Sequence, residues 1–213
     1  MTPEQAWAEL DAPWRRALSL AWEAYGNGTI PVGAALADGT GEIVAEGRNR
    51  IYEENAPPGQ VAGSLLAHAE VNALVGLDPR RRYEDHVLTT SLEPCLLCIG
   101  AAVMATVGRV RYAGADPYGG GDGGLLGTNP HVERLPLAFE GPRADPFGRL
   151  ASALLVAFFL DRKPEGHVIR AFQGRAPEVL GVARALLDAG ARHSSAAGTP
   201  LSEALPALWP AFA

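Results

Sequence analysis

The chain has 213 residues, of which 47% are hydrophobic and 20% are charged, which is usual for a globular protein. Its net charge of −6 argues against a broad basic surface for nucleic acid, although it leaves room for a local basic patch. The only two cysteines stand three positions apart, which excludes a disulfide framework.

Helix and strand patterns alternate along the first 115 residues. In chain order they predict a helix over 4–25, strands over 31–38 and 41–50, a loop over 52–64, a helix over 65–76, a strand over 86–92, a helix after Pro94 and a strand over 109–115. This order predicts a mixed α/β layer with helices packed against the sheet.

The pattern is looser after residue 116. A glycine-rich loop covers 118–127 and lacks the strand-to-helix context of a nucleotide-binding fingerprint. Helices are predicted over 146–162 and 176–190, followed by a flexible patch of Ser, Ala and Gly and an apolar end at 205–212. The most apolar run, 150–160, is too short to span a bilayer, and the N-terminus has no secretory pattern. We therefore expect a soluble, cytoplasmic protein.

Two cysteines and one histidine indicate a candidate metal site. Cys95 and Cys98 follow a proline at a predicted helix start, so their thiols lie on one face and favour the thiolate form. Two thiolates make half of a tetrahedral zinc site, and a third protein ligand would leave one position for water. Two of the five histidines, His68 and His131, have a glutamate two positions later, and only the first pair, His68 and Glu70, lies in a segment that starts a predicted helix.

This set of residues suits a hydrolytic reaction. Zinc lowers the pKa of a bound water to ~7, and a carboxylate beside that water can move its proton to a leaving amine. His-Ala-Glu at 68–70 with Pro-Cys-Leu-Leu-Cys at 94–98 matches the H-x-E…P-C-x-x-C signature of zinc deaminases. A Cys-x-x-C alone would equally suit a redox pair or two buried thiols, so the prediction depends on the joint pattern.

From about Trp14 to Leu160 the sequence resembles the cytidine/deoxycytidylate deaminase superfamily, and within it the branch of bacterial tRNA adenosine deaminases. The stretches that carry the resemblance are ALSLAWEAYGNGTIPVGAAL, GRNR, HAE, TTSLEPCLLCIGAAV and GRVRYAGADP. It implies a three-layer α/β/α fold with a five-stranded mixed sheet, here with extra C-terminal helices. The fifth strand is expected near 132–139 or within the C-terminal region.

The resemblance also implies roles for individual residues. His68, Cys95 and Cys98 would ligate one zinc ion per chain, and Glu70 would shuttle the proton. Asn49, in the stretch GRNR, would contact the base, and the backbone amide of Ala69 would help to hold the ring. An asparagine at a strand end is also a common turn former, which is the alternative for Asn49.

Several departures from the tRNA enzymes bear on the substrate. The 52–64 loop is longer and, with the 118–127 loop, is expected to act as a lid over the pocket. The basic C-terminal tail of those enzymes is missing, and the chain has a single lysine. We divide the chain into a zinc-dependent deaminase domain, 1–163, and a C-terminal helical extension, 164–213, packed on it.

The preferred function is hydrolytic deamination of an aminated nucleobase, nucleoside or related small heterocycle, with ammonia release. A tRNA adenosine deaminase acting at the wobble position is the first alternative. A non-catalytic module built around a structural zinc is the second. A homodimer is expected, because the family builds its pocket partly from a neighbouring subunit and because the apolar end at 205–212 needs covering unless it packs on its own core.

Overall fold

The computed structural model describes residues 1–121, 130–134 and 137–213, and a five-stranded sheet lies at its centre. The strands are β1 Gly33–Ala37, β2 Ile43–Arg48, β3 Val87–Leu92, β4 Arg109–Gly114 and β5 Ala138–Glu140. Their order across the sheet is β2-β1-β3-β4-β5. β1 is antiparallel to β2 and β3, whereas β3, β4 and β5 run parallel. The predicted mixed sheet is confirmed, and the fifth strand follows residue 137.

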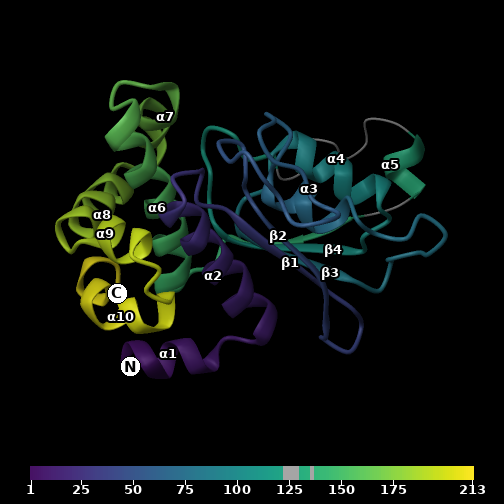
Figure 1. The fold of residues 1–213 in the computed structure, drawn as a ribbon, viewed down its shortest axis with the longest axis horizontal. Helices are drawn as coiled ribbons and strands as arrows, with labels where there is room; N and C mark the ends of the chain where they lie inside the picture. Colours follow the sequence, from purple (N-terminus) through teal and green to yellow (C-terminus); the bar gives the residue numbers. More distant parts are fainter. Residues whose placement is uncertain (122–129, 135–136) are drawn as a thin grey trace.

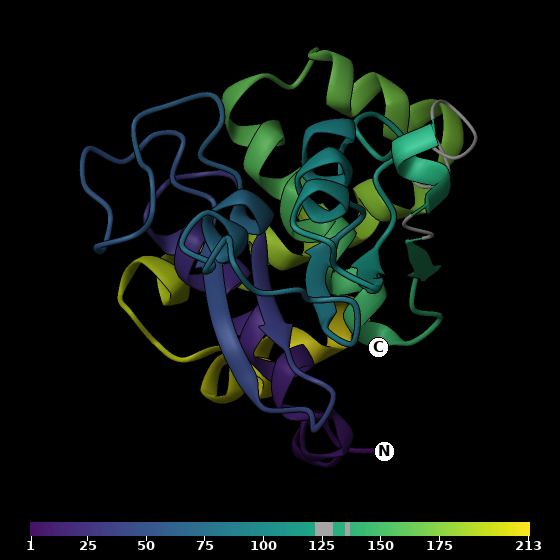
Figure 2. The same cartoon turned by 90° about the vertical axis from the view of Figure 1, so that its right-hand side faces the viewer.

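Helices cover both faces of the sheet (Figures 1 and 2). One layer contains α2 Ala12–Gly26, against β1, β2 and β3, and α6 Pro146–Arg162, against β3 and β4. The other contains α3 Ala69–Leu74, against β1, β2 and β3, and α4 Leu96–Met104, which packs on α3. The predicted α/β/α layering is confirmed.

Glycine lets α3 lie very close to the sheet. A Cβ placed on Gly47 of β2 would come within 2.5 Å of the Ala69 carbonyl oxygen in α3, far inside van der Waals contact. A Cβ placed on Gly33 of β1 would similarly lie 2.3 Å from the Ala17 carbonyl oxygen of α2. Because α3 begins next to His68 and contains Glu70, the packing at Gly47 fixes the position of these two residues relative to the sheet.

The prediction of one N-terminal helix over 4–25 is wrong. The segment forms α1 Pro3–Glu9 and then α2, which begins at Ala12. Asp11 caps α2 by accepting a hydrogen bond from the Trp14 amide at 3.0 Å. Pro13 lies in the first turn, where its missing N–H costs nothing. A strong cap and a proline thus begin a new helix inside a continuous apolar pattern.

The C-terminal part of the chain is helical throughout most of its length. Besides the short α5 Pro130–Arg134, it contains α7 His167–Arg175, α8 Pro177–Asp188, α9 Ala191–Ala196, α10 Leu201–Leu208 and the 3-10 turn Trp209–Ala211. The flexible patch expected after residue 190 is wrong, because α9 packs against α2 and buries Ala191 and Ser195. α8 lies on α6, and α10 lies on α1, on the left in Figure 1.

The apolar end at 205–212 is covered by its own chain. Leu205, Leu208 and Phe212 are buried, and the Trp209 ring lies edge-on to Phe147 at the start of α6. This end therefore offers no apolar surface that requires a second subunit. The division of the chain at residue 163 stays a prediction. Within the described residues, none of the helices is both long and apolar enough to cross a membrane.

Candidate metal centre and pocket

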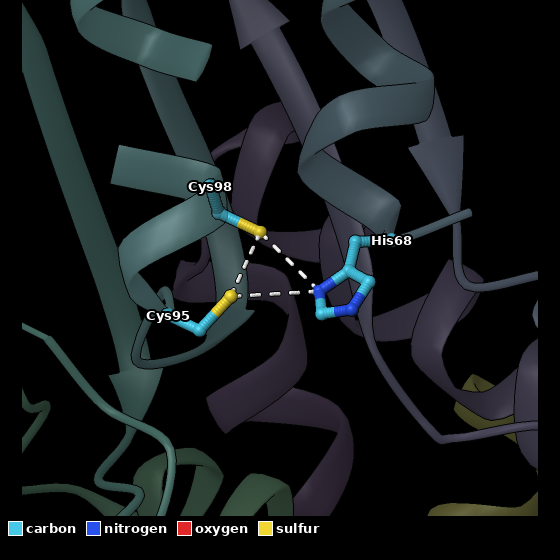
Figure 3. Close-up of side chains that lie close together, drawn as sticks. All are labelled: His68, Cys95 and Cys98. Atoms are coloured by element: carbon cyan, nitrogen blue, oxygen red, sulfur yellow. Dashed lines mark hydrogen bonds between the residues drawn. The ribbon is translucent and has the colours of Figure 1, made fainter. Parts of the chain in front are cut away.

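Three potential metal ligands converge between the N-termini of α3 and α4 (Figure 3). His68 is the N-cap of α3, Cys95 is the N-cap of α4, and Cys98 lies one turn further along α4. α4 follows β3 after a short link that contains the proline before Cys95. The loop after β2 leads to α3, and this link leads to α4, so both bring their ligands to the same edge of the sheet. Residues 27 positions apart in the sequence thus meet at one point.

The distances between the ligand atoms fit a tetrahedral metal site. His68 Nδ1 lies 3.6 Å from Cys95 Sγ and 3.4 Å from Cys98 Sγ, and the two sulfurs are 3.5 Å apart. Zinc–sulfur bonds of about 2.3 Å and zinc–nitrogen bonds of about 2.0 Å give tetrahedral edges of about 3.5–3.8 Å. The three side chains therefore suit one zinc ion, with the fourth position left to a non-protein ligand.

The electrostatics of the cysteine pair favour metal binding. The hydrogen bond with Cys98, helped by that with His68, lowers the pKa of the Cys95 thiol to about 4. The same interaction and burial raise the pKa of Cys98. One thiolate is therefore available at neutral pH before a metal enters, and the metal would displace the second proton.

Glu70 lies beside this group in the first turn of α3. Its carboxylate accepts a hydrogen bond from the Thr90 hydroxyl at 3.1 Å, and its second oxygen is 3.2 Å from Cys98 Sγ. Only 3% of the residue is exposed, and burial raises its pKa. A buried carboxyl with a raised pKa has the properties of a group that both accepts and returns a proton.

Asn49 and Ala69 lie next to the same centre. Asn49 follows β2 and is buried, and its Oδ1 accepts hydrogen bonds from the Thr29 hydroxyl at 2.7 Å and the Ile51 amide at 3.1 Å. Both bonds use the oxygen, and Asn49 is one of the residues that line the cavity described below. Ala69 is the first residue of α3, where backbone N–H groups have no partner within the helix.

A cavity of about 200 Å³ opens over the centre. Its polar lining includes Asn49, His68, Glu70 and Cys95. Tyr118 and Gly119, from the predicted 118–127 loop, also line it. The sequence did not single out the remaining lining residues, which are Ile30, Val32, Leu92, Glu93, Asp116, Leu155, Phe159 and Val168. Glu93 could have been found because it precedes the Pro-Cys-x-x-C motif. Leu155, Phe159 and Val168 gave no local signal, because they come from helices far along the chain.

The predicted lid is corrected in part. Among the described residues, none of those that line the cavity comes from the 52–64 loop. That loop is fixed to β2 instead: Glu53 pairs with Arg48 and Arg50, and Gln60 donates to the Glu46 carbonyl at 2.8 Å. Tyr118 and Gly119 begin the glycine-rich loop and do line the cavity, whereas its residues 122–127 lie outside the described part of the chain.

A larger hollow of about 750 Å³ lies away from this centre, at the Val87 end of β3. Its charged groups pair with one another: His86 with Asp85, and Arg111 with Asp11. It lacks the convergence of metal ligands seen at the smaller cavity, so the smaller cavity is the better candidate site.

The comparisons with known proteins agree with this site. Residues 9–114 match the family model described as the cytidine and deoxycytidylate deaminase zinc-binding region. The chain is 35% identical to the tRNA-specific adenosine deaminase of Haemophilus influenzae, over 48% of this chain and 56% of that protein. Residues 9–114 therefore belong to the cytidine and deoxycytidylate deaminase family and form its zinc-binding region.

Two further similarities concern a longer protein and the fold. It is 38% identical to tRNA(Ile)-lysidine synthase of Deinococcus radiodurans, over 66% of this chain but 24% of that protein. The chain thus spans about a quarter of the length of this relative and just over half of the adenosine deaminase. A solved structure of guanine deaminase from Nitrosomonas europaea has a TM-score of 0.50 and 22% identity, over 70% of this chain and 85% of that one. This structure supports the fold.

Proposed function

We propose that the protein is a zinc-dependent hydrolytic deaminase of an aminated nucleobase, nucleoside or related small heterocycle. The observation that carries the proposal is the buried carboxyl of Glu70 beside three converging metal ligands at a cavity of about 200 Å³. His68, Cys95 and Cys98 would hold one zinc ion, and the ion would lower the pKa of a water in its open position to ~7. We also propose that the enzyme works in the cytoplasm.

Each residue of the site has a separate role in the proposed reaction. Glu70 takes a proton from the attacking water and returns it to the amine as the carbon–nitrogen bond breaks, so that water and the amine become the oxo product and ammonia. Thr90 holds the Glu70 carboxyl through its hydroxyl hydrogen bond. The side-chain NH₂ of Asn49 and the backbone amide of Ala69 orient the ring.

A structural zinc module is a poorer interpretation of this site. Structural zinc sites almost always use four protein ligands, and three converge here among the described residues. A structural ion also has no use for Glu70, whose carboxyl has a pKa raised by burial, which is typical of a group at a catalytic site.

Small substrates fit the surface charge better than tRNA. Binding of an anticodon loop requires basic groups that neutralise several phosphates. The cluster Arg80–Arg82 is exposed, but Arg80 pairs with Asp78 and Arg82 with Glu84, so acidic neighbours offset its charge. The net charge of −6 and the single lysine point the same way. We therefore propose a small-molecule substrate and keep tRNA as the alternative.

Ammonia release decides between these substrates. We expect the purified, zinc-loaded protein to release ammonia from at least one free base or nucleoside, and to leave the adenosine of an anticodon stem-loop unchanged at physiological salt. A coupled ammonia assay with the small substrates and inosine analysis of the stem-loop measure the two outcomes. Efficient inosine formation in the stem-loop with no reaction of the small substrates would reverse the ranking.

We propose in addition that the protein forms a homodimer through α3 and α4. Large apolar side chains are exposed near the start of both helices: Leu65 (80%), Leu66 (58%) and Leu96 (55%). Met104 at the end of α4 is 70% exposed. An exposed apolar patch of this kind marks a protein contact surface. This surface, rather than the buried C-terminal end, needs a partner.

Disruption of this surface tests the dimer. A charge at its centre, as in Leu66→Glu, is expected to convert a dimer into a monomer, because an unpaired carboxylate would be buried in the contact. Light scattering at micromolar concentration measures the mass of both proteins. The control is Val44→Glu, at an exposed position of β2, which should leave the mass unchanged. A monomeric unmodified chain would refute the dimer.

A further inference from the structure

The C-terminal helix α7 reaches the candidate active site, although it lies outside the part of the chain that matches the family model. Val168 of α7 lines the cavity beside Leu155 and Phe159 of α6. The neighbouring Ile169 and Phe172 are 1% exposed, so α7 is anchored in the core rather than resting loosely on the surface. The position of Val168 is therefore fixed, and its side chain sets the extent of the cavity on this side.

α7 also holds the segment that forms the lip of the cavity. The Tyr118 ring stacks on the His167 ring, with centroids 6.2 Å apart and planes 13° apart. Arg175 at the other end of the helix donates a hydrogen bond to the Pro117 carbonyl at 2.9 Å. Two contacts, one at each end of α7, thus fix the segment that carries the lining residues Asp116, Tyr118 and Gly119.

The polar groups of the cavity suit N–H donors and not phosphate. Beyond the metal ligands, the polar side chains that line it are the carboxyl groups of Glu70, Glu93 and Asp116, the amide of Asn49 and the hydroxyl of Tyr118. The described lining residues include neither lysine nor arginine, which are the usual partners of a phosphate group. The volume of about 200 Å³ lies below the range of about 300–1,000 Å³ that is usual for ligand pockets, so the cavity suits a ring better than a ring with a sugar phosphate.

From these observations we infer that α7, through Val168 and the His167–Tyr118 stack, limits the substrate to an unphosphorylated aminated ring. The inference rests on the proposed deaminase function and deepens it, since it assigns the choice of substrate to the C-terminal extension. Free bases are accepted, nucleosides are turned over less well, and nucleoside 5′-phosphates are rejected.

The test compares two variants of the full-length, zinc-loaded protein, in each of which one valine side chain is shortened to alanine. Val168→Ala enlarges the cavity, whereas Val179→Ala in α8 removes the same group from an equally buried site away from the cavity. The probes are cytosine, adenine and guanine, their nucleosides and their 5′-monophosphates. For each probe kcat/KM is measured by ammonia release, and binding is measured by calorimetry, with zinc content and Tm recorded for every variant.

We expect Val168→Ala to raise the nucleoside-to-base ratio of kcat/KM by about tenfold, the scale at which apolar pockets discriminate by small groups. Val179→Ala should lower Tm without changing that ratio. An equal change in both variants, or a wild-type preference for monophosphates, would overturn the inference.

If wild-type protein releases no ammonia from any probe, the proposed function fails. The inference is then decided by binding alone: it stands if Val168→Ala, and not Val179→Ala, gains nucleoside binding, and it falls otherwise.

Discussion

Replacement of Cys98 by alanine is expected to remove zinc and activity together. Cys98 supplies one of three converging ligand atoms and is 1% exposed, so no other group can take its place without moving α4. Even the loss of a hydrogen-bonding partner behind a metal ligand costs about 10–100-fold in affinity, and the loss of the ligand itself should cost more. We expect the zinc content of the variant to fall from one equivalent per chain to background, as measured by elemental analysis.

A second variant in the same helix separates metal loss from instability. Val103→Ala removes a buried side chain of α4 that is not near the ligand atoms, and it should retain zinc despite a lower Tm. Full zinc content and unchanged turnover in Cys98→Ala would show that the metal centre has been assigned to the wrong residues.

Substitution of Glu70 is expected to abolish catalysis while leaving the metal in place. Glu70→Gln keeps the shape of the side chain and can still accept the hydrogen bond from Thr90, but it cannot carry a proton. We expect kcat to fall by at least ~10²-fold, the usual scale for the loss of a general acid–base group. Glu70→Ala should fall at least as far. The zinc content and the Tm of Glu70→Gln should stay close to those of the unmodified protein.

Zinc analysis gives the outcome that would contradict this role. If both Glu70 variants lose zinc, the carboxylate is itself a ligand, and the proton must be moved by another group. If Glu70→Gln retains both zinc and full turnover, the carboxyl has no part in the reaction. Lower activity with retained zinc is the combination that only a proton shuttle explains.

The sequence by itself determined the elements that depend on local signals. Strands β1 and β2 follow from the hairpin signal of the Asp-Gly-Thr-Gly turn at 38–41, and α6 follows from a long apolar pattern that ends before Pro164. The metal ligands could be predicted because helix N-termini, the Cys-x-x-C spacing and the glutamate after His68 are all short-range features. The family match and the converging ligands agree with this reading, while the role of each residue stays a prediction.

Only the tertiary structure decided what surrounds these ligands. Leu155, Phe159 and Val168 line the cavity because α6 and α7 pack across the edge of the sheet, and no local pattern marks them. The patch of Ser, Ala and Gly is expected to be flexible because Ser and Gly have weak helix preferences, yet burial of Ala191 and Ser195 against α2 makes part of it a helix. Packing between distant segments contributes more free energy than local propensity. For that reason the metal ligands could be predicted from the sequence, whereas the residues that line the pocket could be identified only in the folded structure.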